Sequence, residues 1–278
     1  MTIPTWTAHG GLELPVLGFG TFGLKGADGA DAVARAIEKG YRLIDSAFNY
    51  ENEGTVGEGI RRSGIDRDEL IVTSKLEGRH QERDAAIPSI EESVFRTGLG
   101  HLDLMLIHWP NPKTDKYVEA WQALIEARDA GIVKAIGVCN FLPEHLERLV
   151  RETGELPQVN QIEMHPHFPQ EECIRFNAEH GILTEAWSPL GRETGILEDD
   201  VIVDIARTHD VTPGQAVLAW AIARGAIPIP KAASDKRQLE NLGALEVELV
   251  EEEIAAITAL GRPDGRLADQ DPAEYEEF

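Results

Sequence analysis

The strongest constraint on the fold is an alternation of short apolar runs with longer amphipathic stretches, which continues through nearly all of the 278 residues. Each apolar run has the length of a strand, and each following stretch has the periodicity of a helix. The runs that predict strands are 16–19, 42–45, 70–75, 102–108, 135–139, 159–163, 183–187 and 226–229. The helical patterns are 30–39, 56–62, 85–96, 118–130, 144–152, 171–180, 201–208, 213–223 and 251–260.

This alternation predicts parallel strands, because parallel neighbours need a crossover connection and cannot be joined by a tight turn. Eight such units in a chain of this length predict an α/β fold, the (β/α)8 TIM barrel. No linker or break in composition divides the sequence, so we expect one domain over residues 1–278. Residues 1–15 carry a hairpin signal around His9–Gly11 and are expected to plug the barrel, while residues 261–278 form an acidic C-terminal tail.

The composition excludes several classes of protein. Lys and Arg number 26 against 49 Asp and Glu, and the net charge of −23 argues against nucleic-acid and membrane-surface binding. No apolar run approaches the roughly 20 residues of a membrane span, and the two cysteines provide no disulfide framework. Without a secretory signal at the start, a cytoplasmic location is expected. The acidic excess favours solubility, with adaptation to a salty cytosol as the alternative.

A glycine pattern near the start, Gly18–Gly23, matches the G-x-G-x-x-G fingerprint of Rossmann folds, and Asp45 lies 22 residues beyond it. That fingerprint needs a helix to open at its third glycine, because the pyrophosphate binds at the helix N-terminus. Here residues 24–29, which include two more glycines, intervene. We interpret the pattern as a flexible loop over the barrel mouth.

Polar side chains and one tryptophan follow the predicted strands, at the end where (β/α)8 enzymes hold their active sites. They are Asp45, Lys75, His108, Asn140, Gln161, Glu163, Trp187 and Lys231. Tyr50 follows Asp45 in the next loop, close enough for its phenol to reach the same rim.

The four residues Asp45, Tyr50, Lys75 and His108 are suited to protonating a carbonyl oxygen. An ammonium beside a phenol stabilises the phenolate and lowers the phenol pKa from about 10. A carboxylate behind the lysine keeps it charged, and the histidine can orient a substrate oxygen. Each residue also has a structural alternative: a buried ion pair for Asp45 and Lys75, a loop aromatic for Tyr50, and a core histidine for His108.

The wording around these residues resembles the aldo-keto reductase family from about residue 12 to 260. The motifs are GYRLIDSAFNYENE at 40–53, SK at 74–75, LIHWP at 106–110, GVCNF at 137–141, NQIE at 160–163, IPK at 229–231 and LEN at 239–241. Within the family, the sequence is most similar to the bacterial branch that includes the 2,5-diketo-D-gluconate reductases.

The resemblance implies Tyr50 as general acid, Lys75 and Asp45 tuning it, and His108 orienting the carbonyl. It also implies an extended NADPH lying across the rim, with NADH less favoured. The implied cofactor-binding residues are Asn140, Gln161, Trp187, Ser188, Leu190, Gly191, Lys231, Arg237, Glu240 and Asn241. The implied substrate-binding residues are Phe22, Phe48, Glu77 and Trp109.

The sequence departs from the family pattern at several positions. Cys139, Ala232 and Ser234 replace residues that usually help to hold the cofactor. Glu77 stands where relatives often carry tryptophan, so it either adds negative charge to the pocket or pairs in solvent with Arg79 or Arg83.

We therefore expect a monomeric, NADPH-dependent reductase of small aldehydes, ketones or dicarbonyls, with keto-sugar acids among the possible substrates. One alternative is polyol or sugar oxidation by the same chemistry. Another is a redox-sensing regulatory subunit that binds NADPH and turns over slowly. His165 and His167 flank a proline without a third ligand, so no metal is expected.

Overall fold

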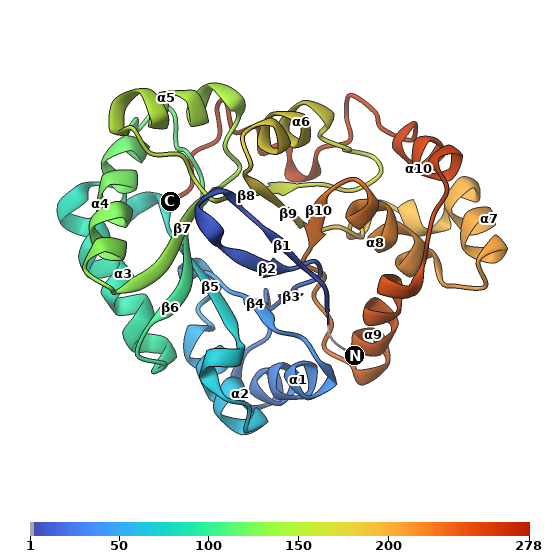
Figure 1. The fold of residues 1–278 in the computed structure, drawn as a ribbon, viewed down its shortest axis with the longest axis horizontal. Helices are drawn as coiled ribbons and strands as arrows, with labels where there is room; N and C mark the ends of the chain where they lie inside the picture. Colours follow the sequence, from blue (N-terminus) through green and yellow to red (C-terminus); the bar gives the residue numbers. More distant parts are fainter. Residues whose placement is uncertain (1–2) are drawn as a thin grey trace.

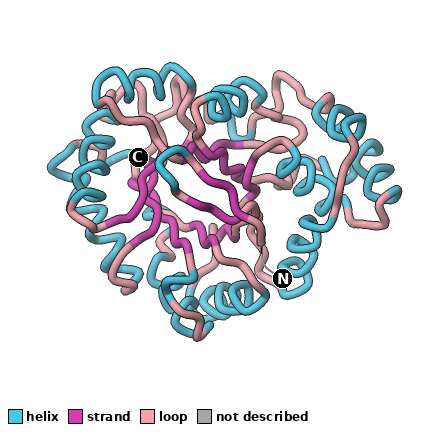
Figure 2. Tube along the Cα trace, in the orientation of Figure 1, coloured by secondary structure: helices cyan, strands magenta, loops and turns pink. Residues whose placement is uncertain are grey.

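The computed structural model describes residues 3–278 and confirms the (β/α)8 barrel (Figures 1 and 2). Its eight parallel strands are β3 (Phe19–Gly20), β4 (Leu43–Asp45), β5 (Ile71–Leu76), β6 (Leu102–Ile107), β7 (Val133–Cys139), β8 (Val159–Glu163), β9 (Leu183–Trp187) and β10 (Ala226–Pro228). Each strand pairs in parallel with its neighbour in chain order, as right-handed crossovers require.

Glycines at the first strand close the barrel. Gly18 N–H donates to Pro228 O at 3.0 Å and Gly20 N–H donates to Pro230 O at 3.2 Å, which joins β3 to the end of β10. A Cβ on Gly20 would lie 2.8 Å from the Ile229 carbonyl oxygen, so this approach needs glycine. The expectation of a flexible loop over 18–23 is therefore corrected: Gly18 and Gly20 belong to the barrel wall.

Helices surround the barrel, as the sequence predicts (Figure 1). They are α1 (Gly26–Lys39), α2 (Glu53–Ser63), α3 (Arg83–Thr97), α4 (Tyr117–Asp129), α5 (Pro143–Thr153), α6 (Glu171–Glu179), α7 (Asp200–Thr208), α8 (Pro213–Ala223), α9 (Asp235–Leu242) and α10 (Glu251–Thr258). The sequence analysis did not identify α9, which is short and buries only Gln238, Asn241 and Leu242, so its apolar periodicity is weak. Ser234 caps this helix by accepting a hydrogen bond from Arg237 N–H.

An N-terminal hairpin covers the end of the barrel where the strands begin. Its strands β1 (Thr5–Thr7) and β2 (Glu13–Pro15) pair antiparallel, and Leu14 packs in one cluster with barrel residues that include Leu43 and Leu104. Figure 1 shows the hairpin lying across the barrel opening. The first two residues of the predicted hairpin segment lie outside the described residues. Functional side chains are therefore expected at the opposite end.

Within residues 3–278, no helix has both the length and the apolar character needed to cross a lipid bilayer.

Candidate active site

Asp45, Tyr50 and Lys75 meet at the C-terminal end of the strands. Asp45 ends β4, Lys75 lies in β5, and Tyr50 ends a 3-10 turn, η2 (Phe48–Tyr50). Lys75 Nζ donates to the two Asp45 carboxylate oxygens at 2.6 and 2.8 Å, and it lies 3.5 Å from Tyr50 Oη. The lysine side chain is completely buried, and its Nζ also donates to the Ser46 carbonyl at 2.7 Å.

Burial controls the acidity of the phenol. It raises the pKa of Tyr50 to about 12, although the charge of Lys75 acts in the opposite direction. This corrects the expectation that the lysine lowers the phenol pKa below its ordinary value. Burial acts to lower the pKa of Lys75, but the Asp45 carboxylate outweighs it and the pKa is raised. At neutral pH the site thus holds a protonated phenol beside a charged ammonium.

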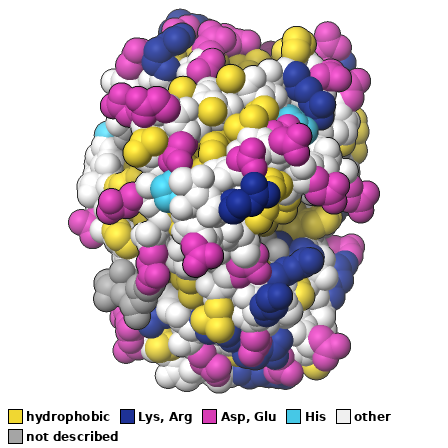
Figure 3. Space-filling view, turned by 90° about the vertical axis from the view of Figure 1, so that its right-hand side faces the viewer, with side chains coloured by type: hydrophobic (Ala, Val, Ile, Leu, Met, Phe, Trp, Pro, Cys, Tyr) yellow, Lys and Arg dark blue, Asp and Glu magenta, His cyan; other side chains and the backbone are white. Residues whose placement is uncertain are grey.

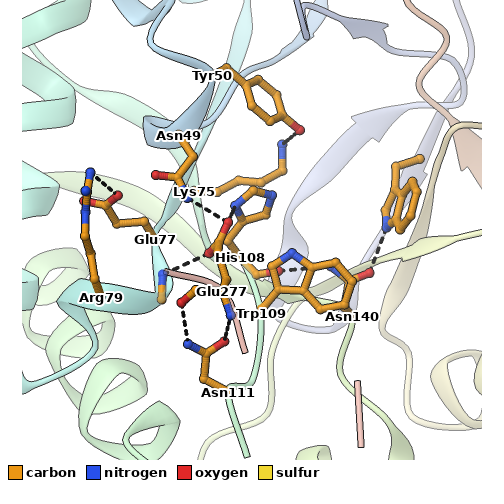
Figure 4. A network of polar contacts seen from close by, with 12 residues as sticks. Asn49, Tyr50, Lys75, Glu77, Arg79, His108, Trp109, Asn111, Asn140 and Glu277 are labelled. Carbon is orange, nitrogen blue, oxygen red and sulfur yellow. Dashed lines mark hydrogen bonds and ion pairs between the residues drawn. The ribbon is translucent and has the colours of Figure 1, made fainter. Parts of the chain in front are cut away.

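His108 follows β6 and completes the group. Its ring packs edge-on against Tyr50, with 5.9 Å between ring centroids. Figure 4 shows the imidazole between the phenol and a carboxylate that the sequence analysis did not identify, Glu277. His108 Nδ1 lies 2.7 Å from Glu277 Oε1. Nothing in the local sequence around residue 277 indicates this contact, because it joins positions far apart in the chain.

A second buried carboxyl lies behind Asp45. Gln161 of β8 donates through Nε2 to Asp45 Oδ1 at 2.9 Å and to Glu185 Oε2 of β9 at 2.8 Å. Burial, and next the charge of Asp45, raise the pKa of Glu185 to about 7. Because both acceptors fix the amide nitrogen of Gln161, its Oε1 stays available to a ligand donor.

A cavity of about 1150 Å³ opens above Asp45 and Tyr50 and extends toward α9. It is larger than most small-molecule sites. Seven of the ten expected cofactor residues line it: Trp187, Ser188, Leu190, Lys231, Arg237, Glu240 and Asn241. Asn140, Gln161 and Gly191 lie outside its lining.

The cations that line this cavity are not used in ion pairs. Within residues 3–278, no carboxylate lies within ion-pair distance of Lys231, Arg237 or Arg192. Arg192 was not predicted from the sequence, although it directly follows the expected cofactor residue Gly191; its Nε donates to Ser188 Oγ at 2.8 Å. Acidic side chains are scattered over the face of the molecule that Figure 3 shows. Three unpaired cations in a chain of charge −23 indicate a site for an extended anion.

Asn140 orients the tryptophan of the cavity. It follows β7 in the left-handed conformation, with φ of 62°. Its Nδ2 donates to the His108 carbonyl at 3.0 Å, and its Oδ1 accepts from Trp187 Nε1 at 2.8 Å. The loop after β7 thereby connects the catalytic group to the aromatic wall.

Two of the four expected substrate residues lie at the site. Phe22 is 55% exposed, lines the cavity and packs edge-on against Tyr50 at 5.1 Å between centroids. Trp109 packs against Tyr275 at 4.5 Å and Trp187 at 6.5 Å. These rings form an apolar wall beside His108.

The other two expected substrate residues, Phe48 and Glu77, point elsewhere. Phe48 packs under the guanidinium of Arg96, at 3.9 Å from its ring centroid, and lines a separate hollow. Glu77 is completely buried and pairs with Arg79 at 2.7 Å (Figure 4). Its other carboxylate oxygen lies 2.7 Å from His80 Nδ1. The pairing with Arg79 agrees with the second predicted arrangement, but the predicted exposure to solvent is wrong, because the carboxylate is buried outside the cavity lining. The expectation of a Glu77 charge in the pocket is therefore corrected.

The two histidines that were considered as metal ligands have protein partners. His165 Nε2 lies 3.0 Å from Glu163 Oε1, and His167 Nδ1 lies 2.9 Å from Arg262. In the described part of the chain, no three His, Cys, Asp or Glu side chains are grouped as metal ligands.

The model of the Aldo/keto reductase family matches residues 16–262, which span the barrel and all four residues of the catalytic group. The chain belongs to the aldo/keto reductase family. It is 46% identical to 2,5-diketo-D-gluconic acid reductase B of Corynebacterium sp. (strain SHS752001) over 99% of each chain. It is 40% identical to methylglyoxal reductase DkgA of Yersinia pestis over 92% of each chain.

Solved structures of other family members share the fold. The crystal structure of a Bombyx mori aldo-keto reductase in complex with NADP superposes with a TM-score of 0.91, at 32% identity and with coverage of 100% of this chain and 99% of that one. The apo crystal structure of Gox0644 superposes with a TM-score of 0.92, at 40% identity and 98% coverage of both chains. This aldo/keto reductase therefore keeps the family barrel over its whole described length.

Proposed function

We propose that this aldo/keto reductase uses NADPH to reduce small aldehydes, ketones and dicarbonyls to alcohols. One observation carries the proposal: the proton-donating group of Tyr50, Lys75 and Asp45 lies at the bottom of a large cavity whose cations have no ion-pair partner among residues 3–278. Such a cavity fits an extended anionic cofactor, and the proton-donating group at its bottom fits a carbonyl oxygen.

The residues present fit NADPH. Trp187 offers a ring face, Gln161 Oε1 can accept from an amide, and the unpaired Arg237, Lys231 and Arg192 can bind phosphate oxygens. Arg237 and Lys231 suit the 2′-phosphate, and Arg192, in the loop after β9, suits the pyrophosphate. When bound there, NADPH supplies the hydride for the carbonyl carbon.

The side chains of this protein manage the proton and the geometry. Tyr50 is protonated at neutral pH and donates its proton to the carbonyl oxygen. Lys75 then stabilises the phenolate at the moment its charge forms, and Asp45 holds the ammonium in place. His108 hydrogen-bonds the same oxygen and orients the carbonyl beside the apolar wall of Trp109.

The dicarbonyl class is supported by two relatives, which are named for 2,5-diketo-D-gluconic acid and methylglyoxal. An enzyme is favoured over a slowly reacting regulatory subunit because the complete proton-donating group is assembled at hydrogen-bonding distances.

The test is NADPH consumption with a panel of neutral aldehydes, ketones, dicarbonyls and keto-sugar acids, followed by the loss of absorbance of the reduced cofactor. Turnover with at least one class, abolished in Tyr50→Phe, is expected. A protein that binds NADPH but reduces no carbonyl compound would overturn the proposal.

A further inference from the structure

The segment that follows α10, residues 261–278, returns across the barrel to the active site. We refer to it as the tail segment. Tyr275 packs on Trp109, and Glu276 accepts hydrogen bonds from the backbone N–H of Lys113 and Thr114. These contacts anchor the tail segment on the loop that follows β6, the same loop that begins with His108.

The backbone of Glu277 is held more tightly still. Asn111 Nδ2 donates to Glu277 O at 2.9 Å, and Glu277 N–H donates back to Asn111 Oδ1 at 3.0 Å. Gly78 lies against the same point: a Cβ there would be 2.3 Å from Glu277 O and 2.4 Å from Asn111 Nδ2. Glu277 thus occupies a fitted position and is buried in it.

The Glu277 carboxylate faces donors on every side. Asn49 Nδ2 donates to Oε1 at 2.8 Å, Gly78 N–H donates to Oε2 at 2.9 Å, and His108 Nδ1 lies 2.7 Å from Oε1 (Figure 4). Burial acts to raise the pKa of Glu277, but His108 and these hydrogen bonds outweigh it and the pKa is lowered. The group is therefore ionised at neutral pH.

An ionised carboxylate has no proton to share, so the proton of this contact is on His108 Nδ1. The contact is an ion-pair approach at 2.7 Å, and Nδ1 is buried without a hydrogen bond in the described residues; a nitrogen lone pair this close to Oε1 would be repelled. Neutral imidazole carries one proton, and once Nδ1 holds it, Nε2 can accept a hydrogen bond but cannot donate one.

We propose that Glu277 is a positioning residue that holds the proton of His108 on Nδ1, so that the other nitrogen donates to a carbonyl oxygen only while the imidazole is doubly protonated. The inference rests on the proposed carbonyl reduction for its kinetic consequence. By this inference, Glu277 determines whether Nε2 of His108 can donate or only accept a hydrogen bond.

Two titratable groups contact the ring, Tyr50 from η2 and Glu277 from the tail segment, and Lys75 of β5 lies 3.5 Å behind the phenol oxygen. The pKa values of Tyr50 and Lys75 are both raised, so neither changes charge near neutral pH. Glu77, next to Gly78 in sequence, is neutralised by Arg79. The charges of Tyr50, Lys75 and Glu277 therefore stay constant near neutral pH.

The direct test is the tautomer of His108, read by long-range ¹H–¹⁵N NMR of protein labelled in histidine. His108→Asn identifies the signals by their loss. We expect Nδ1 to be the protonated nitrogen of the neutral ring in the unmodified protein. A neutral ring protonated on Nε2 would overturn the proposal, and this outcome needs no variant of the tail segment.

The variant Glu277→Gln tests whether the tautomer of His108 reverses when the carboxylate is replaced by an amide. With its oxygen toward Gly78 N–H, the amide turns its NH₂ toward His108 Nδ1, which then becomes the acceptor. We expect the neutral ring to shift to the Nε2–H form. Glu276→Gln, a change of the same kind at a half-buried neighbour that does not contact His108, should leave the tautomer as it is. If Glu277→Gln folds poorly, Gly78→Ala displaces the carboxylate instead and should also release the tautomer.

The kinetic test compares kcat/KM for carbonyl reduction across pH. The proposal makes donation to the carbonyl depend on the doubly protonated ring in the unmodified protein, whereas in Glu277→Gln the neutral ring also donates. The ratio of kcat/KM of the variant to that of the unmodified enzyme should thus rise as the pH rises. Parallel profiles would overturn the inference alone. Absence of carbonyl reduction in both proteins, with the expected tautomers seen by NMR, would overturn only the proposed function.

Discussion

Tyr50 acts as an acid because its phenolate is stabilised as it forms during the reaction, and not because the pKa of the phenol is low in the resting enzyme. With a pKa of about 12, the phenol remains protonated throughout the physiological range. Lys75 is positioned before the reaction begins and cannot move away from Asp45. Its attraction is therefore stronger for the phenolate of the transition state than for the ground-state phenol, which is the difference that accelerates a reaction.

Replacing Tyr50 with Phe removes the proton donor but keeps the ring that packs on Phe22. We expect kcat/KM for carbonyl reduction to fall by about 10²-fold or more, the usual contribution of a general acid. NADPH affinity, measured by quenching of protein fluorescence, should change less than threefold. Activity within about tenfold of the unmodified enzyme would show that another group donates the proton.

Glu185 makes the stability of the protein depend on pH. The pKa of Glu185 is about 7 in the folded state and about 4.3 in the unfolded state. Between these two pH values, Glu185 is protonated in the folded protein and ionised in the unfolded protein. Stability from this group is therefore complete below about pH 4 and falls as the pH rises toward 7.

Glu185→Gln removes this dependence while retaining an acceptor for Gln161. Relative to the unmodified protein, the variant should gain on the order of 3 kcal/mol of unfolding free energy between pH 5 and pH 8. Urea unfolding at the two pH values gives the difference, in which other titrating groups cancel. An equal difference at both values would show that Glu185 is ionised throughout.

Arg237 and Arg192 should discriminate between cofactors in different ways. Charge-assisted bonds contribute about 1.5–3 kcal/mol, so Arg237→Ala should weaken NADPH about tenfold or more and leave NADH nearly unchanged. Arg192→Ala should weaken both, because the pyrophosphate is common to them. Dissociation constants for both cofactors decide the assignment. Equal losses in Arg237→Ala would place that residue away from the 2′-phosphate.

At the scale of secondary-structure elements, loops rather than helices complete the site. Gly78 begins a 3-10 turn, η4 (Gly78–His80), directly after β5, and its missing side chain leaves the space that Glu277 fills. A substitution there acts on the catalytic group through the tail segment, without touching Tyr50 or Lys75.

Gly78→Ala should lower kcat for carbonyl reduction by roughly tenfold or more, because its Cβ displaces the Glu277 backbone and frees the His108 ring. The barrel and the cofactor cavity are expected to persist, so circular dichroism and NADPH affinity should change little. Gly54→Ala in α2 is a suitable control, since its Cβ would meet no heavy atom closer than 3.5 Å. Full activity in Gly78→Ala would mean that the tail segment is not needed for turnover.

Elements with a local pattern could be predicted, and contacts across the chain could not. The ends of β4, β5 and β6 place Asp45, Lys75 and His108 on one rim because strand ends in a barrel share that rim. Glu77 satisfies the same rule, yet Arg79 lies two residues away and pairs with its buried carboxylate outside the cavity lining. Glu277 follows no strand, so periodicity gives no indication of its contact with the site.

Energetic quantities were harder to predict than positions. The sequence places an ammonium beside a phenol, but the sign of the Tyr50 pKa change depends on how much water the barrel excludes. Likewise, Gly18 and Gly20 resemble loop residues in the sequence, and their role depends on how closely β10 approaches. Burial and close approach are properties of the assembled barrel.

For the molecule as a whole, the net charge of −23 is compatible with a cavity that binds anions, because three unpaired positive side chains line the cavity, whereas many of those on the outer surface lie near carboxylates. Many arginines of the outer surface are paired with carboxylates, as Arg83 is with Glu126 and Arg62 with Glu58. Arg192, Lys231 and Arg237, which line the cavity, are not. This separation creates a local positive potential that the overall charge conceals.

The long reach of the tail segment sets an order of events during synthesis. Barrel closure needs Gly20 and Lys231, and both are made before residue 277, whose contacts with Gly78 and Asn111 span 199 and 166 positions. A growing chain can therefore assemble its barrel while its histidine is still unrestrained. Chains stalled on the ribosome with residue 260 exposed should lack turnover, and chains exposed through residue 278 should show it. Activity in the shorter chains would separate catalysis from the tail segment; its absence would make the late synthesis of the tail segment a safeguard against premature consumption of reducing power.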